Sequence, residues 1–109
     1  MKPADIIDLP RTHNNAATEI LLRLYVTGRT ESAARAIATL STLQQELGAH
    51  KISVEIIDVL EDPIAAMNDD VYATPTVFRI KPGPIRRLFG NISSPEMVVA
   101  GLQLADNRD

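Results

Sequence analysis

The sequence contains no cysteine and no tryptophan, and aromatic residues make up only 4% of its 109 residues. Without a thiol the chain forms no disulfide and offers no thiolate nucleophile, so thiol redox catalysis is excluded. The absence of cysteine fits a reducing compartment but does not require one. No apolar run approaches the length of a membrane span, and the N-terminus lacks the apolar segment of a signal peptide. We therefore expect a cytoplasmic protein with no membrane partner.

A surplus of positive charge is also absent. The formal net charge is -3 and the sequence pI is about 5.3, whereas a general nucleic-acid binder needs a basic surface, so we expect no nucleic-acid partner. His13 and His50 are isolated in the sequence, so we expect neither a metal site nor a Ser-His-acid triad. The chain also lacks the glycine pattern of a phosphate loop. These absences favour a protein that is not an enzyme, has no catalytic residues and carries no cofactor.

Length and composition indicate one globular domain. Hydrophobic residues make up 45% and charged residues 23% of the chain, which is close to the average for a soluble domain. Residues 1–17 differ from the rest, because Pro3, Pro10 and a polar run interrupt any periodicity. We interpret residues 1–17 as a flexible N-terminal extension, with docking onto the body or a partner as the alternative, and residues 18–109 as the folded domain.

The first half of this domain has the pattern of a βαβ unit. Apolar residues alternate over residues 20–26 and predict a strand with one strongly apolar face. Thr30 is a suitable N-cap for a helix that continues to Gly48, a typical helix end. Residues 52–59 are apolar on both faces, as expected of a strand covered on both sides. We expect a right-handed crossover between two parallel strands.

Two further helices are predicted in the second half. Asp62 followed by Pro63 is a good helix start, with a side-chain acceptor at the cap and proline at the first helical position, so residues 64–67 should form a short helix. Ser93 and Glu96 have the spacing of a capping box ahead of a final apolar helix.

Two strands are predicted between these helices. Thr74 and Pro75 precede an apolar strand over residues 76–80, and a proline at a strand entrance indicates a cis-proline bend. A turn rich in proline and glycine then leads to a strand over residues 85–89, which should pair antiparallel with the first. The resulting order, βαβαββα, predicts an α/β domain of thioredoxin-like lineage.

Four segments of the chain resemble the KaiB family: LRLYVTG at 22–28, IDVLEDP at 57–63, ATPT at 73–76 and PIRRLFGNIS at 84–93. The resemblance implies two alternative folds that share the βαβ N-terminal half. In the thioredoxin-like state the C-terminal half is ββα, whereas it is rearranged in a ground state that is often tetrameric. It also implies binding of KaiC, a hexameric ATPase, in the thioredoxin-like state. We expect a KaiC-like ATPase partner, with a histidine kinase or another clock protein as further partners, and a homo-oligomer, either a dimer or a tetramer.

The resemblance and the local chemistry together suggest site residues. Gly90 and Asn91 are the candidate hinge of a fold switch, because glycine tolerates positive φ and asparagine visits that region more readily than most residues. Four residues are candidates for partner binding: Tyr25, Asp70, Arg86 and Arg87. For the two arginines the alternative interpretation is a solvent-facing hairpin edge protected from aggregation by charge.

The sequence also departs from the cyanobacterial pattern of the family. Asp70 stands where lysine is familiar, Asn91 where aspartate is usual, and Gly83 interrupts a run of prolines. A reversed charge alters electrostatic complementarity, so the partner is expected to be the chain's own KaiC-like ATPase.

We therefore predict a regulatory binding protein that works in circadian or stress-related timing. Two other functions stay open at this point. One is a thioredoxin-like enzyme with chemistry that needs no thiol. The other is a stand-alone sensor domain related to the input domains of histidine kinases.

Overall fold

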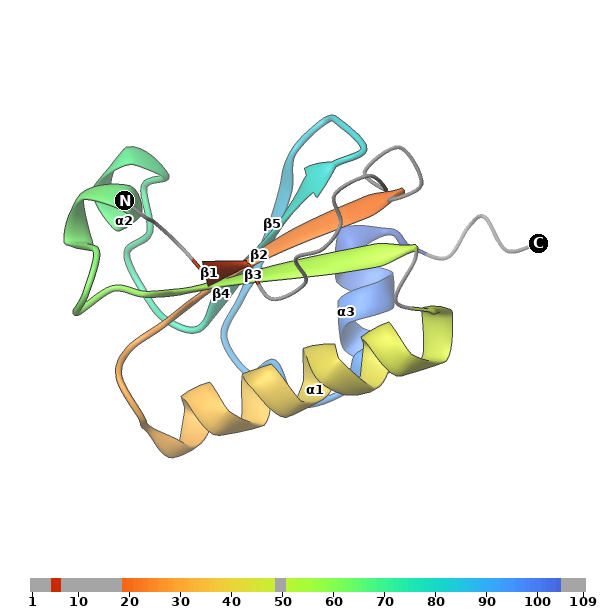
Figure 1. Cartoon of the computed structure of the whole chain (residues 1–109), viewed down its shortest axis with the longest axis horizontal. Coiled ribbons are helices and arrows are strands. Elements are labelled where there is room, and N and C mark those ends of the chain that lie inside the picture. The colour runs from red at the N-terminus through yellow and green to blue at the C-terminus, as the bar shows by residue number, and fades with distance from the viewer. Residues whose placement is uncertain (1–4, 7–18, 49–50, 105–109) are drawn as a thin grey trace.

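A computed structural model of the chain describes residues 5–6, 19–48 and 51–104. In these residues a sheet with the strand order β1-β3-β2-β4-β5 lies between α1 and α3 on one face and α2 on the other (Figure 1). The strands are β1 (Asp5–Ile6), β2 (Ile20–Val26), β3 (Ile52–Asp58), β4 (Thr76–Lys81) and β5 (Arg86–Phe89). The helices are α1 (Glu31–Leu47), α2 (Pro63–Asn68) and α3 (Pro95–Leu102).

The βαβ unit is confirmed. β2 and β3 pair in parallel, with Leu22 opposite Val54, and α1 connects them. Thr30 caps α1, because its side chain accepts a hydrogen bond from the Ala33 amide at 3.1 Å. At the other end Gly48 adopts a φ of 101°, which glycine tolerates without cost. β4 then pairs antiparallel with β2, and β5 antiparallel with β4.

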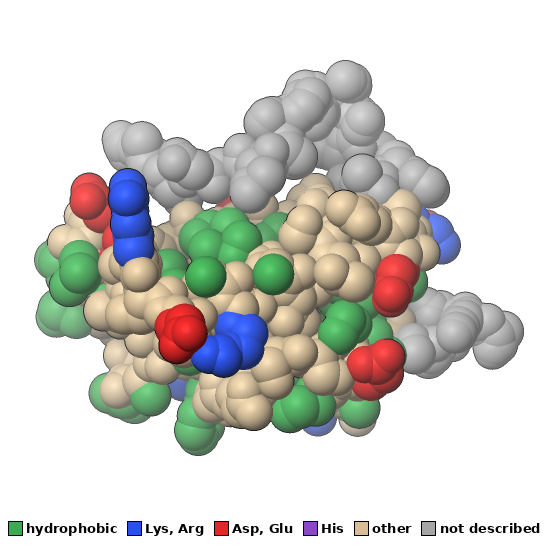
Figure 2. All heavy atoms as spheres, turned by 90° about the horizontal axis from the view of Figure 1, so that it is seen from below, with side chains coloured by type: hydrophobic (Ala, Val, Ile, Leu, Met, Phe, Trp, Pro, Cys, Tyr) green, Lys and Arg blue, Asp and Glu red, His purple; other side chains and the backbone are tan. Residues whose placement is uncertain are grey.

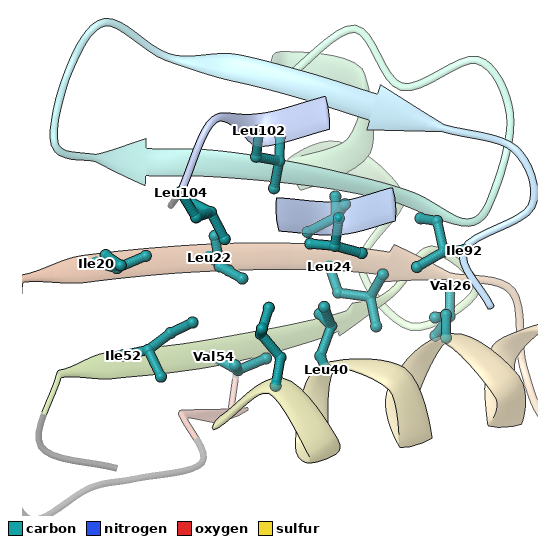
Figure 3. Packing of buried hydrophobic residues seen from close by; sticks show 14 of the residues in the cluster. Ile20, Leu22, Leu24, Val26, Leu40, Ile52, Val54, Ile92, Leu102 and Leu104 are labelled. Atoms are coloured by element: carbon teal, nitrogen blue, oxygen red, sulfur yellow. The ribbon is translucent and has the colours of Figure 1, made fainter. Parts of the chain in front are cut away.

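Two apolar clusters lie on opposite faces of the sheet. The larger one packs β2 and β3 against α1 and α3, and Leu22, Leu24 and Leu102 are fully buried in it (Figure 3). The smaller one lies beneath α2 and contains Tyr25, Phe78 and neighbouring side chains. This division follows from the alternation along β2, since successive side chains of a strand point to opposite faces. The fold is α/β and thioredoxin-like, with a ββα C-terminal half.

Several boundaries differ from the prediction, including the end of β4 at Lys81 and both ends of α2. α3 is capped by Ser94 and not by Ser93, because Pro95 occupies the first helical turn and the Ser94 hydroxyl accepts from the Met97 amide at 3.3 Å. β3 ends at Asp58, one residue before the predicted end. β5 begins at Arg86, one residue after the predicted start, because the β4–β5 ladder ends at the pair formed by Arg79 and Arg86.

The N-terminal segment contributes to the sheet at one point. Asp5 and Ile6 pair antiparallel with β3, opposite Ile56 and Glu55. These two residues are therefore docked onto the body of the domain, as the alternative interpretation of residues 1–17 proposes. The rest of residues 1–17 lies outside the described residues, so the division between extension and domain stays a prediction.

The peptide bond between Thr74 and Pro75 is cis, the conformation expected at this strand entrance. Two further cis bonds precede Pro82 and Pro84 in the turn between β4 and β5. The Thr74 hydroxyl lies 2.6 Å from the hydroxyl of Thr27, so the bend is joined to the end of β2.

Candidate binding surface

The segment Asp69–Asp70, between α2 and β4, is where most of the predicted partner-binding residues meet. α2 begins at the Asp62 cap, whose side chain accepts from the Ala65 amide at 3.1 Å. It ends where the Asp69 amide donates to the Ala65 carbonyl, and Asp70 then adopts a φ of 56°. This left-handed residue turns the chain back towards β4 and leaves the Asp69 side chain facing β2.

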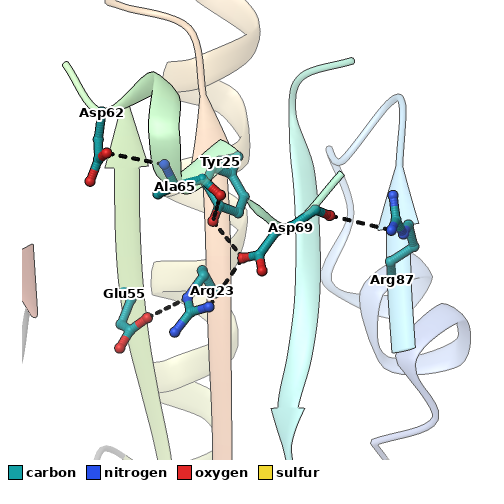
Figure 4. A network of polar contacts seen from close by, with 7 residues as sticks. All are labelled: Arg23, Tyr25, Glu55, Asp62, Ala65, Asp69 and Arg87. Carbon is teal, nitrogen blue, oxygen red and sulfur yellow. Dashed lines mark hydrogen bonds and ion pairs between the residues drawn. The ribbon is translucent and has the colours of Figure 1, made fainter. Parts of the chain in front are cut away.

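Two side chains of β2 join the Asp69 carboxylate to the sheet (Figure 4). Arg23 of β2 donates from Nε to Glu55 Oε1 at 2.7 Å and from Nη1 to Asp69 Oδ2 at 3.1 Å. The Tyr25 hydroxyl donates to the same Asp69 oxygen at 2.5 Å and also lies 3.1 Å from the Ala65 carbonyl. Arg23 thus bridges two carboxylates that are half-buried, a geometry in which ion pairs are screened less than at the open surface.

Burial and neighbouring charges shift the pKa of two residues of this group, Tyr25 and Arg23. Burial raises the pKa of the Tyr25 phenol, and the hydrogen bond to Asp69 raises it further, because ionisation would place a second negative charge beside the carboxylate. Burial alone would lower the pKa of Arg23, but its bonds to Glu55 and Asp69 outweigh that effect and leave the pKa raised. At neutral pH the phenol is therefore a donor and the guanidinium is charged.

A side chain of β5 also binds the backbone of the Asp69–Asp70 segment. Arg87 donates from Nη1 to the Asp70 carbonyl at 2.9 Å and from Nη2 to the Asp69 carbonyl at 3.4 Å. Its guanidinium carbon lies 4.9 Å from the centre of the Phe78 ring, which in turn contacts Tyr25 edge-on at 5.9 Å. We call the residues that hold this segment the Asp69 network: Arg23, Tyr25, Glu55, Asp69 and Arg87.

The structure brings together three of the four partner-binding candidates, namely Tyr25, Asp70 and Arg87. Tyr25 is fully buried, whereas Asp70 and Arg87 are exposed. Arg86 does not join them. It is exposed and lies opposite Arg79 in the ladder, and because neighbours on a strand point to opposite faces, its side chain leaves the sheet on the other side from Arg87.

The hinge candidates lie beside the cis-proline bend. Gly90 has a φ of 108°, and its amide donates to the Pro75 carbonyl at 3.2 Å. Asn91 is exposed. It lies three residues before Ser94, the residue that caps α3.

Sequence reasoning missed Asp69, Arg23 and Glu55 as one group. Arg23 and Glu55 are the polar residues of two strands predicted to be parallel, and they are paired in the β2–β3 register. A register prediction would have found that pair. Asp69 is 46 residues from Arg23 in the chain, and no local pattern joins them.

Large apolar side chains are exposed next to this network. Leu60, Ile64 and Met67 are 68%, 61% and 69% exposed, and they lie on α2 or just before it. We call these three residues the α2 surface. In the view from below, apolar side chains also gather at the end of the molecule where α2 lies, on the left of both views (Figure 2). Exposed apolar patches on a small domain are typical of interaction sites.

Charged residues are unevenly distributed around these features. Residues 52–78 contain acidic side chains and no lysine or arginine, and residues 79–95 contain four basic side chains and no acid. The acidic stretch comprises β3 and α2, and the basic stretch includes β5 and the turn before it.

Neither a candidate metal-ligand cluster nor a candidate membrane span is found in the described residues. In them, no three histidine, aspartate or glutamate side chains gather as metal ligands, while His13 and His50 lie outside this part of the chain. Within the same residues no helix has the length and apolar character of a membrane span.

Comparison with known proteins identifies relatives of the whole domain. Residues 23–104 match the KaiB domain. The circadian clock oscillator protein KaiB of a Nostoc species is 37% identical over 91 residues, which cover 84% of each chain. The protein of the same name from Prochlorococcus marinus is 39% identical over 90 residues, covering 83% of this chain and 84% of that one.

Solved structures with lower sequence identity have a similar fold. The N-terminal domain of Synechococcus elongatus SasA superposes with a TM-score of 0.64 at 20% identity, covering 84% of this chain and 90% of that one. Mitochondrial thioredoxin 3 of Saccharomyces cerevisiae superposes with a TM-score of 0.64 at 21% identity, covering 79% and 78%. These structures support the thioredoxin-like fold, and the match to the KaiB domain together with the identity to the Nostoc and Prochlorococcus proteins shows that the chain belongs to the KaiB family of circadian clock proteins.

Proposed function

We propose that this chain is a non-enzymatic regulator that binds a KaiC-type hexameric ATPase and works in circadian or stress-related timing. The observation that carries the proposal is the match to the KaiB domain over residues 23–104 in a chain whose C-terminal half has the ββα arrangement. The absence of cysteine supports binding over catalysis, because the thiolate on which thioredoxin chemistry depends is missing.

The α2 surface and the Asp69 network together form the proposed docking site. Leu60, Ile64 and Met67 supply apolar area whose burial drives association. Asp70 is exposed beside them and supplies a charge that fixes partner choice. Tyr25 and Arg87 act indirectly, by holding the Asp69–Asp70 segment in place through the bonds described above.

Regulation by fold switching is the second part of this proposal. A ligand that binds one of two conformations shifts the population towards it, and its apparent affinity falls in proportion to the fraction of competent protein. The thioredoxin-like form would be the competent one, and a self-associated ground state, either dimer or tetramer, would store the rest of the protein. A histidine kinase or another clock protein would then compete for or join the complex.

Mixing the full-length protein with its cognate KaiC-like ATPase tests both parts. We expect binding that depends on the bound nucleotide and a rate that saturates with ATPase concentration, because only the competent form docks. Met67→Glu should weaken binding by about tenfold or more, since it places a charge in the apolar patch. Met97→Glu is the matched control, because Met97 is also exposed, at 42%, but lies on α3 across the sheet.

Three results would count against the proposal. No binding to any nucleotide state of the ATPase would remove the proposed partner. A rate that rises linearly with concentration, without a lag, would show that fold switching is not the gate. Equal loss of binding in the Met67 and Met97 variants would show that the α2 surface is not the docking site.

A further inference from the structure

Arg79 of β4 is a buried cation, with 7% of its surface exposed. Its Nη1 atom donates to the Leu102 carbonyl at 2.9 Å and to the Gln103 carbonyl at 3.3 Å. Its Nη2 atom donates to the Pro84 carbonyl at 2.9 Å, while the buried Nε atom has no hydrogen-bond partner among the residues that the structure describes. Among the described residues, no carboxylate forms an ion pair with Arg79.

This environment is unusual for a buried guanidinium, which is ordinarily paired with an acid. In place of an acid, carbonyl groups at the C-terminal end of α3 accept the hydrogen bonds of Arg79. The last carbonyls of a helix lack partners within it and carry partial negative charge. Gln103 ends α3 with a φ of 55°, and both Leu102 and Gln103 direct their carbonyls at Arg79.

The bonds of Arg79 connect three separate pieces of the C-terminal half. Arg79 itself belongs to β4, Pro84 lies in the turn that leads to β5, and Leu102 and Gln103 end α3. We propose that Arg79 couples the β4–β5 hairpin to α3, so that the two elements form and open as one cooperative unit. If α3 leaves its place, a charge buried without compensation remains in the hairpin, and that cost discourages partly rearranged states.

A second contact between hairpin and helix differs in kind. Leu88 of β5 packs so closely on Gly101 of α3 that an added Cβ there would lie 3.0 Å from Leu88 Cδ1. This apolar contact is not directional and involves no charge. It therefore provides a control: Leu88→Ala weakens packing between the elements but leaves the carbonyl bonds of Arg79 intact.

Native-state hydrogen exchange on the free full-length protein, in increasing urea, tests the coupling. In the wild type, amides of the hairpin and of α3 should share one opening equilibrium. In Arg79→Met the α3 amides should separate from those of the hairpin and open about tenfold more often, because the buried charge and its donors are gone. Arg79→Lys keeps the charge, so in this variant the two groups of amides should still open together. Arg86→Met, which removes an exposed arginine beside it, should change neither group. Leu88→Ala should make the hairpin amides and the α3 amides open more often and to the same extent.

The proposal is overturned if the two groups of amides already open separately in the wild type, or if they remain together in Arg79→Met. Should Arg79→Met fail to fold, Arg79→Gln, which also removes the charge, decides in its place. The consequence for timing rests on the proposed function, because a cooperative C-terminal half would switch fold in one step. The exchange experiment contains no ATPase, so a failure to bind ATPase would count against the proposed function and leave the result on Arg79 unaffected.

Discussion

Gly90 has a backbone conformation that other residues adopt only at a cost, with a φ of 108°. None of the described residues lies within 4 Å of the position that a Cβ would take, so a substitution there acts through the backbone and not through a clash with them. The sequence alone identified Gly90 as a hinge candidate but did not give the direction of its effect. The structure gives the direction of the effect, because the positive φ of Gly90, which is costly for any other residue, belongs to the thioredoxin-like arrangement.

We expect Gly90→Ala to destabilise this arrangement by about 1 kcal/mol, which changes a ratio of two states about fivefold. The ratio of states measured by NMR tests this. Gly83→Ala is the control, because Gly83 also has open space around its Cβ position and its φ is outside the positive region. An unchanged ratio in Gly90→Ala would show that the hinge lies elsewhere.

Because of Tyr25, the free energy of unfolding should depend on pH in the alkaline range. The pKa of Tyr25 is raised in the folded state, mainly by burial, so its contribution is complete below the unfolded pKa of about 10 and is lost as the pH rises above that value. Tyr25→Phe should lower the free energy of unfolding by about 1 to 3 kcal/mol at neutral pH and weaken the further loss above pH 10.

Urea unfolding between pH 7 and pH 11 measures both effects. Tyr72→Phe is the matched control, because that ring is 87% exposed, and its unfolding should follow the wild type. A Tyr25→Phe variant that loses stability above pH 10 as steeply as the wild type would contradict this interpretation.

At the scale of elements, local chemistry predicted which segments form helices and strands but not every end. β2, α1 and β4 follow from alternation, a capping threonine and a proline at the strand entrance. Ser93 and Ser94 are adjacent, and both precede a helical pattern, so the choice between them depends on Pro95 and on where the chain leaves β5. β1 could not be predicted, because the two residues Asp5 and Ile6 are too short for a pattern.

Ser94→Ala should lower the free energy of unfolding by about 1 kcal/mol, because it removes the acceptor of the Met97 amide at the start of α3. Ser93→Ala, one residue earlier, should have an effect within about 0.5 kcal/mol, since Ser93 is exposed and caps nothing. Urea unfolding of both variants provides the comparison. If Ser93→Ala were the more damaging change, the predicted capping box would be correct after all.

At the scale of the whole molecule, the sequence predicted the α/β architecture and the family, but it did not predict how distant side chains meet. The Asp69 network joins residues from β2, β3, β5 and the end of α2, and one of its bonds spans 46 residues. Arg79 is similar, because its partners are carbonyls whose identity carries no sequence signal. Periodicity reports which face of an element is buried, whereas the pairing of charges across elements depends on register and on where helices end.

The uneven distribution of charge along the chain also separates charges of opposite sign across the sheet, because β3 and β5 lie on opposite sides of the β2–β4 pair. Acidic residues lie on β3 and on both sides of α2, and the basic residues of the β5 hairpin come from a separate stretch of sequence, so the field of the protein is not that of a uniformly negative sphere with a charge of -3. In the field of any charged partner, such a charge distribution rotates the protein before contact, because attraction of one end and repulsion of the other exert a torque within about one Debye length. Orientation of the first encounter would therefore depend on ionic strength even where the net charges of the two partners repel.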